Sequence, residues 1–231
     1  LGRKGAAQCL TKKNDGESYF LLIPRDCGKF SGQPYKKIKA PNGFVFHHLN
    51  AYEKNKQIIL ESIYYNDFPT IGPNEDFRDI DFNLIPEGKL KRCEIDLSNE
   101  TIREKILSRQ CCEFAMVNPD NQGLSARFSW MATAECAIGN GPLQAIKKLD
   151  LHNGKEIFWS AAPRGFVSEP LFIPKLNTEK EDSGWVISLI WNAEERVTEL
   201  VILKAEDLSL ECTLELPIAI PHGLHGSWAN E

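Results

Sequence analysis

Apolar and polar residues alternate with a period of two through most of the chain, and no long stretch repeats with the period of a helix. This pattern predicts an all-β protein. The clearest strands are expected in six segments: residues 18–25, 43–48, 56–65, 126–135, 184–191 and 196–205. The last two segments are separated by Asn-Ala-Glu-Glu, which predicts a hairpin with a four-residue turn.

A repeat also runs along the chain. In four segments an apolar strand ends in a polar turn and a second amphipathic strand follows: residues 21–39, 90–107, 145–160 and 200–216. With Pro24, Asp96, Asp150 and Lys204 as equivalent points, the intervals are 72, 54 and 54 residues. Strand-rich units at such a period are typical of β-propeller blades. The alternative is a β-sandwich whose hairpins happen to be alike.

Four blades lie at the low end for a closed propeller. In addition, the opening residues LGRKGAAQCL contain neither an initiator Met nor a signal-peptide pattern. We therefore expect residues 1–231 to be several blades of one larger propeller domain, and the chain to be a fragment of it. The isolated chain is expected to aggregate, because an open run of blades exposes unpaired strand edges.

Composition narrows the class of protein. The net charge of −5, without a basic tract, argues against a nucleic-acid partner. No apolar run approaches the roughly 20 residues that span a bilayer, although loose contact with a membrane surface stays open. The seven cysteines form no C-x-x-C pair and are expected to be reduced thiols in a cytosol-like compartment.

Histidines carry the candidate chemistry, because the chain has no P-loop, no nucleotide-binding glycine pattern, no G-x-S-x-G and no H-E-x-x-H. His47 and His48 lie in a probable strand, where neighbouring side chains point to opposite faces, so at most one faces a shared cavity. Both faces are apolar, so the alternation does not choose between them. A structural role for each histidine is the alternative.

Residues 218–228, IAIPHGLHGSW, hold His222 and His225. This segment either forms a surface turn or carries a metal ligand at a strand end. His47 and His225 are 178 positions apart, which excludes a local chelate. In a propeller, however, the innermost strands of distant blades line one channel, so imidazoles from both positions can reach one iron, copper or zinc ion.

Two glutamates flanked by apolar residues, Glu113 and Glu169, are candidates to accept hydrogen bonds from the ligating rings. Most isolated glutamates in strands are simply solvated, which is the alternative for this pair. A proline follows Glu169 and favours an extended backbone there.

Six motifs, in order along the chain, resemble the carotenoid cleavage oxygenase family, and most closely its bacterial and cyanobacterial members: FHHLNAYE, EFAMVN, GFVSEPLFIPK, EDSGWVISLIW, ELVILKAEDL and IPHGLHGSW. Each motif is weak alone, but together they extend over most of the chain. The resemblance implies the C-terminal half of a seven-bladed β-propeller. It also implies a non-haem iron(II) ion, Fe2+, on the propeller axis, held by four histidines.

The resemblance implies that His47 and His225 are two of these ligands. Glu113 and Glu169 match the carboxylates that orient them, Glu113 for His47 and Glu169 for His225. His222 is then a neighbour of the site. The remaining two ligands and a third glutamate are expected upstream of Leu1.

Phe44, Phe46 and Trp228 flank the motifs and are expected to line the substrate tunnel, with core packing as the alternative. Ala115 departs from the family, which commonly has Pro at this position.

The implied activity is cleavage of a conjugated double bond of a carotenoid or apocarotenoid by O2, giving two carbonyl products. Alternatives are cleavage of stilbene-type phenolics, isomerisation coupled to ester cleavage, and a non-catalytic propeller scaffold or inactive fragment. The implied partners are a hydrophobic polyene, O2 and the missing N-terminal half. The expected location is the cytoplasm, or a plastid in a plant or alga, with peripheral membrane contact open.

Overall fold

The computed structural model describes residues 9–10, 16–26, 32–69, 80–136 and 138–229. Within these residues the chain forms four antiparallel sheets. The first sheet pairs β1 (Ser18–Leu22) with β2 (Lys36–Ala40). The second contains β3 (Phe44–Lys54), β4 (Gln57–Tyr65), β5 (Lys89–Asp96) and β6 (Ile102–Ile106).

The third sheet contains β7 (Cys112–Met116), β8 (Phe128–Ala134), β9 (Leu143–Asp150) and β10 (Glu156–Ser160). The fourth contains β11 (Gly165–Val167), β12 (Leu171–Pro174), β13 (Gly184–Asn192), β14 (Val197–Lys204) and β15 (Leu210–Glu215). A short 3-10 helix, η3 (Pro119–Asn121), follows β7.

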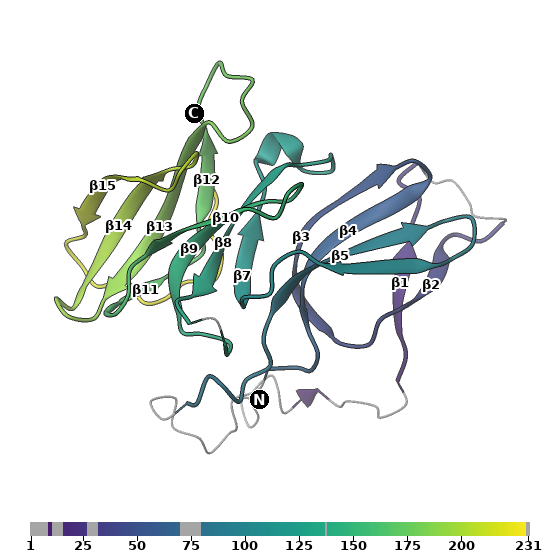
Figure 1. Ribbon diagram of the computed structural model, residues 1–231, viewed down its shortest axis with the longest axis horizontal. Helices are drawn as coiled ribbons and strands as arrows, with labels where there is room; N and C mark the ends of the chain where they lie inside the picture. Colours follow the sequence, from purple (N-terminus) through teal and green to yellow (C-terminus); the bar gives the residue numbers. More distant parts are fainter. Residues whose placement is uncertain (1–8, 11–15, 27–31, 70–79, 137, 230–231) are drawn as a thin grey trace.

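In the second and third sheets each strand pairs with the next along the chain, which is the arrangement of a propeller blade. In the fourth sheet, β11 and β12 pair with successive parts of β13. Figure 1 shows the three larger sheets following one another across the molecule in chain order.

The predicted strands correspond to β1, β3, β4, β8, β13 and β14. The β13–β14 hairpin turns at residues 193–196, one residue later than the pattern indicated. The predicted repeat is present in its last three units, because Asp96, Asp150 and Lys204 end β5, β9 and β14, each third in the hydrogen-bonded order of its sheet. Pro24 follows β1 in the two-stranded sheet, so the first unit does not share this position. The 54-residue interval is therefore the distance from one blade to the next.

Apolar residues on both faces of β8 hold the third sheet between its neighbours. Trp130 packs toward the fourth sheet and stacks on Phe172, with ring centroids 4.3 Å apart. Met131, the next residue, points to the opposite face and packs with Ile63 and Leu90 of the second sheet. Burial of each such side chain stabilises the fold by about 1.5–3 kcal/mol. Because both faces of β8 pack against a neighbouring sheet, the strand lacks the polar face of a surface strand.

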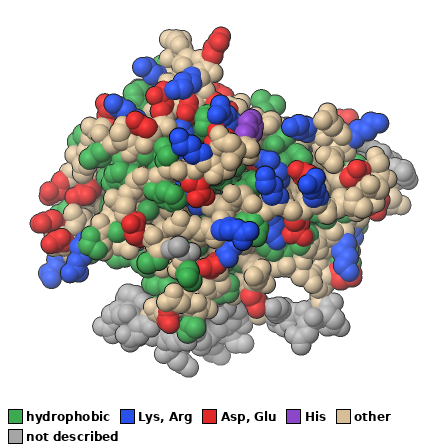
Figure 2. All heavy atoms as spheres, in the orientation of Figure 1, with side chains coloured by type: hydrophobic (Ala, Val, Ile, Leu, Met, Phe, Trp, Pro, Cys, Tyr) green, Lys and Arg blue, Asp and Glu red, His purple; other side chains and the backbone are tan. Residues whose placement is uncertain are grey.

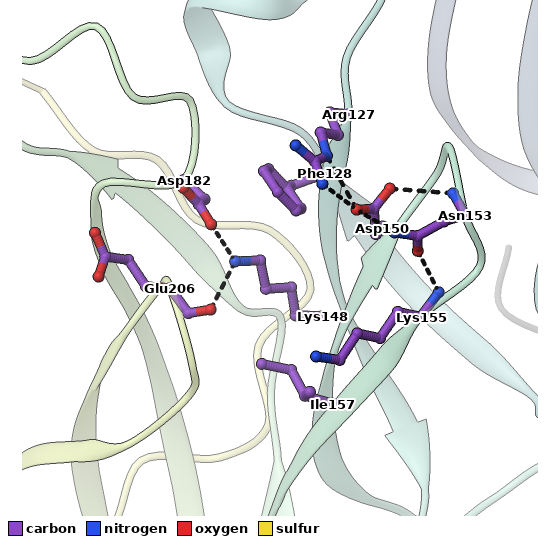
Figure 3. Close-up of a pocket in the computed structure, with 9 residues that line it drawn as sticks. All are labelled: Arg127, Phe128, Lys148, Asp150, Asn153, Lys155, Ile157, Asp182 and Glu206. Carbon is purple, nitrogen blue, oxygen red and sulfur yellow. Dashed lines mark hydrogen bonds and ion pairs between the residues drawn. The ribbon is translucent and has the colours of Figure 1, made fainter.

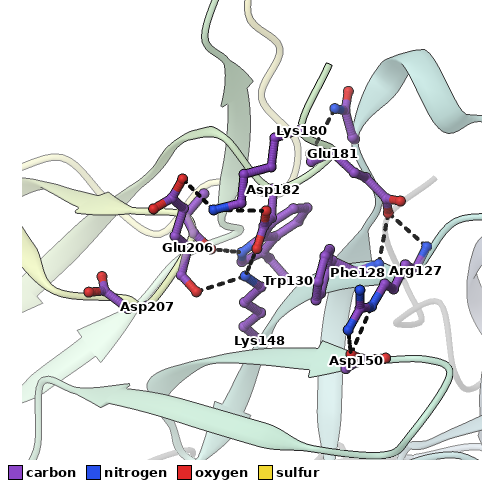
Figure 4. A network of polar contacts seen from close by, with 12 residues as sticks. Arg127, Phe128, Trp130, Lys148, Asp150, Lys180, Glu181, Asp182, Glu206 and Asp207 are labelled. Atoms are coloured by element: carbon purple, nitrogen blue, oxygen red, sulfur yellow. Dashed lines mark hydrogen bonds and ion pairs between the residues drawn. The ribbon is translucent and has the colours of Figure 1, made fainter. Parts of the chain in front are cut away.

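Two adjacent buried lysines on β9 join the same three sheets by polar contacts. Lys147 Nζ lies 2.5 Å from Ser108 Oγ, beyond the end of β6. Lys148 Nζ, on the opposite face, donates to Asp182 Oδ2 at 2.5 Å and to the Glu206 carbonyl at 2.8 Å (Figures 3 and 4). Lys147 Nζ also lies 3.5 Å from Glu156 Oε1, so both ammonium groups have a carboxylate partner, as buried charges generally do.

A cavity of about 310 Å³ lies beside Lys148, between the third and fourth sheets (Figure 3). Arg127 and Asp150 form an ion pair at its edge, with 2.9 Å between Arg127 Nη2 and Asp150 Oδ2. This pairing, with two backbone donors, holds the pKa of Asp150 below its usual value although burial opposes the shift. Most of the charged side chains that line the cavity are therefore in ion pairs: Arg127, Lys148, Asp150, Asp182 and Glu206.

Basic and acidic side chains are interspersed over the face of the molecule drawn in Figure 2. In the described part of the chain, no helix is both long and apolar enough to cross a membrane. The described cysteines are free: Cys9, Cys93, Cys111, Cys112, Cys136 and Cys212. Cys27 lies outside the described residues.

Candidate metal centre

His47 lies on β3 where the pairing with β4 is irregular. Val45 opposes Tyr64, but His48 opposes Ser62 and Asn50 opposes Glu61, so β3 holds extra residues on both sides of His48. Such bulges redirect side chains and are common beside functional sites. They separate the adjacent histidines: His47 turns toward Glu113 on β7, and His48 Nδ1 contacts Ser62 Oγ at 2.7 Å.

Glu113 on β7 is the centre of a buried hydrogen-bond network. Its Oε2 accepts from His47 Nδ1 at 2.6 Å and from the Phe114 backbone N–H at 3.0 Å. Its Oε1 accepts from the Tyr65 hydroxyl at 2.5 Å. Burial, and then the neighbouring Glu113 carboxylate, raise the pKa of Tyr65 above its ordinary value, so the hydroxyl remains a donor.

His225 lies in an irregular segment ten residues after the end of β15, so the expectation of a ligand carried at a strand end is wrong for this residue. Glu169, between β11 and β12, faces it. Its carboxylate oxygens lie 3.2 and 3.3 Å from His225 Nδ1, and Oε2 accepts from the Gly226 N–H at 2.8 Å. The carboxylate thus contacts both the ring and the backbone beside it.

The structure brings the two imidazoles together although 178 positions separate them, with 3.4 Å between His47 Nε2 and His225 Nε2. In the neutral tautomer that places the proton on Nδ1, facing the carboxylate, each Nε2 carries a lone pair. Two lone pairs cannot hydrogen-bond to each other, but both can bind one cation. Nitrogens that each bind an ion at about 2.1 Å must lie within about 4.2 Å of each other, a condition that this pair meets.

The donor set fits iron(II), because neutral imidazole suits iron, copper, zinc and nickel, and each ring has the carboxylate that typically orients a ligand. The pair alone is an incomplete site: within the described ranges, no group of three or more His, Cys, Asp or Glu residues is placed to hold a metal ion. Metal binding by His47 and His225 stays a prediction.

Phe44 and Phe46, two of the expected tunnel residues, form an aromatic cluster with Phe68 beside His47. The Phe46 ring is 46% exposed and lies 6.4 Å from the His47 ring, centroid to centroid. Trp228 is also exposed. Their role in lining a tunnel stays a prediction.

The remaining histidines have other surroundings. His222 Nδ1 lies 3.5 Å from Ser168 Oγ, next to Glu169, so it is a neighbour of the site as expected. His152 lies in the turn after β9, where its backbone N–H donates to Asp150.

Two residues of the site were not predicted from the sequence. The Phe114 ring lies 5.2 Å from the His47 ring and 6.1 Å from the His225 ring, and Tyr65 supports Glu113. Phe114 directly follows a candidate glutamate, which is a signal that could have been used. Tyr65 ends a predicted strand, and nothing in its local sequence marks its partner.

The chain is similar to known proteins of one family. The family described as "Retinal pigment epithelial membrane protein" matches residues 1–230. The chain belongs to this family of carotenoid cleavage oxygenases.

Apocarotenoid-15,15'-oxygenase of Synechocystis sp. is 42% identical over 232 residues, which cover 100% of this chain and 46% of that protein. Lignostilbene-alpha,beta-dioxygenase isozyme III of Sphingomonas paucimobilis is 27% identical, covering 90% of this chain and 46% of that protein. The chain thus spans about half the length of the curated relatives it matches.

Among solved structures, cobalt-substituted Synechocystis apocarotenoid oxygenase is 42% identical and superposes with a TM-score of 0.91. The match covers 98% of this chain and 47% of that structure. The structures of this oxygenase are β-propellers, so the predicted fold class is confirmed.

Proposed function

We propose that the complete native protein is an iron(II)-dependent dioxygenase that cleaves one conjugated double bond of an apocarotenoid or carotenoid. The observation that carries the proposal is the convergence of His47 Nε2 and His225 Nε2 to 3.4 Å, with a carboxylate at each Nδ1. The family relationship supports it, and the 42% identity to an apocarotenoid oxygenase favours a polyene substrate.

The reaction needs no external reductant. One C=C bond and one O2 molecule give two C=O bonds, so each alkene carbon takes one oxygen atom. A bound iron(II) ion would supply the activation of O2. The protein supplies the position of the reacting bond and the exclusion of water.

His47 and His225 would hold the ion in this chain, and their Nδ1–H groups would keep their protons because Glu113 and Glu169 accept them. Tyr65 keeps Glu113 in place from the other side. The exposed Phe46 and its neighbours Phe44 and Phe68 offer an apolar surface beside His47 for a hydrophobic substrate. Two further histidine ligands are proposed to come from outside this chain.

The reaction is tested by incubating the iron-loaded native protein with an apocarotenal under 18O2 and analysing the products by mass spectrometry. The expected result is labelled carbonyl products that disappear in His225→Ala. Bound iron without cleavage of any apocarotenal or carotenoid would contradict the polyene substrate.

A second candidate is cleavage of a phenolic alkene, because a lignostilbene dioxygenase and an isoeugenol monooxygenase of Pseudomonas nitroreducens are 27% and 26% identical to the chain. The same assay with a hydroxystilbene distinguishes the two substrates. The identity to these relatives is lower than to the apocarotenoid oxygenase, so we rank this activity second.

The free thiols of the described cysteines are typical of a reducing compartment, and we propose a cytoplasmic location on that basis.

A further inference from the structure

We infer that Phe114 is a positioning residue that holds the His47 and His225 imidazoles in their converged orientation. This inference rests on the proposed metal site and adds a residue to it. The backbone of Phe114 has φ of +54°, a left-handed conformation that bulky residues rarely adopt.

A bulge in β7 creates this conformation. Glu113 opposes Ala132 and Met116 opposes Trp130, so β7 uses three steps where β8 uses two. The bulge takes Phe114 out of the regular ladder, and its N–H turns back to Glu113 Oε2, the oxygen that also accepts from His47. The same backbone turn therefore completes the Glu113 network.

The turn also directs the Phe114 ring toward the two imidazoles. The Phe114 centroid lies 5.2 Å from the His47 ring at an interplanar angle of 42°, and 6.1 Å from the His225 ring at 77°. The two imidazoles are themselves 5.1 Å apart at 85°. The three rings thus form a triangle in which the phenyl contacts both imidazoles.

A phenyl ring neither binds a metal ion nor accepts a strong hydrogen bond, so at this position the ring acts by its size and shape. It fills the space into which each imidazole would otherwise rotate. An unfavourable backbone conformation that persists beside a functional site is held there by its surroundings. The arrangement therefore prepares both Nε2 atoms for one ion before that ion binds.

The test is a cobalt(II) titration of the metal-free native protein, followed by absorption spectroscopy and by the rate of cobalt loss to a chelator. Phe114→Ala is expected to weaken cobalt binding by at least about tenfold, as loss of an orienting neighbour typically does, and to change the spectrum. Phe114→Leu keeps apolar bulk without a flat ring and is expected to weaken it less.

Phe114→Gly separates the effect of losing the ring from the effect of the unfavourable backbone conformation. It is expected to lose as much cobalt affinity as Phe114→Ala but to melt at a higher temperature, because glycine adopts positive φ without steric cost. Phe128→Ala is the matched control. Phe128 is a partly buried phenylalanine of the same sheet that packs against Arg127 and Lys148, and its loss is expected to leave cobalt binding unchanged.

Native affinity, spectrum and release rate in Phe114→Ala would overturn the inference while leaving the metal site intact. If that variant does not fold, native values in Phe114→Leu would overturn it equally. Failure of the unmodified protein to bind cobalt would overturn the proposed function, and this inference with it.

Discussion

His47 and His225 differ in how completely their surroundings hold them. The His47 side chain is 28% exposed and its partner Glu113 is 12% exposed, with 2.6 Å between Nδ1 and Oε2. The His225 side chain is 57% exposed, its partner Glu169 is 21% exposed, and the nearest contact is 3.2 Å. His47 is carried by β3, an edge strand of the second sheet, and His225 by the irregular segment after β15.

The difference indicates that the two sides of the site have different roles. On the His47 side, both oxygens of Glu113 accept hydrogen bonds from buried or partly buried donors, so the loss of Glu113 leaves donors unsatisfied. The His225 side faces solvent, which can replace a lost hydrogen bond. We infer that the β3–β7 side is preformed and that the C-terminal segment adds the second histidine to it.

The largest effect is expected for Glu113→Ala. It leaves the Tyr65 hydroxyl and His47 Nδ1 without their acceptor, which is expected to cost about 2–3 kcal/mol of the free energy of unfolding. Metal affinity is expected to fall by about 10–100-fold. Urea denaturation of the metal-free protein and cobalt titration measure the two effects. An unchanged free energy of unfolding would contradict a preformed His47 side.

A smaller effect is expected for Tyr65→Phe, which removes one hydrogen bond to a charged acceptor and is expected to cost about 1.5 kcal/mol. Burial raises the pKa of Tyr65 in the folded state, so its contribution is complete below pH 10 and declines as the pH rises further. Urea denaturation at pH 7 and above pH 10 checks both points. The gap between variant and native protein should narrow at the higher pH; a gap that widens would contradict this sign.

The smallest effect on stability is expected for Glu169→Ala. Because His225 is exposed, water can accept from its Nδ1–H, and the free energy of unfolding is expected to change by less than about 1 kcal/mol. Cobalt affinity is still expected to fall, because the ring loses its orientation. A loss of stability as large as that of Glu113→Ala would contradict the difference between the two sides.

The sequence predicted most of the regular fold. Alternation located strands such as β13 and β14, and the 54-residue repeat located β5, β9 and β14, which occupy the same place in the hydrogen-bonded order of the three larger sheets. Short strands such as β7 and β12 were not predicted, because a few residues buried among neighbouring sheets have no alternation to detect.

The site was predicted from family motifs rather than from periodicity. Strict alternation treats His47 and His48 as pointing to opposite faces but does not choose the face of the site, and two bulges in β3 decide it. The bulge at Phe114 depends on packing between sheets, so local sequence does not predict its positive φ. Likewise, the Tyr65–Glu113 contact joins residues 48 positions apart in different sheets.

The most direct test of the central claim, that His47 and His225 bind one ion together, is the iron content of the native protein and of two variants of the C-terminal segment. His222→Ala is the matched control, because His222 lies three residues from His225 and contacts Ser168 instead. We expect about one iron per chain in the native protein and in His222→Ala, and almost none in His225→Ala. Native iron content in His225→Ala would contradict it.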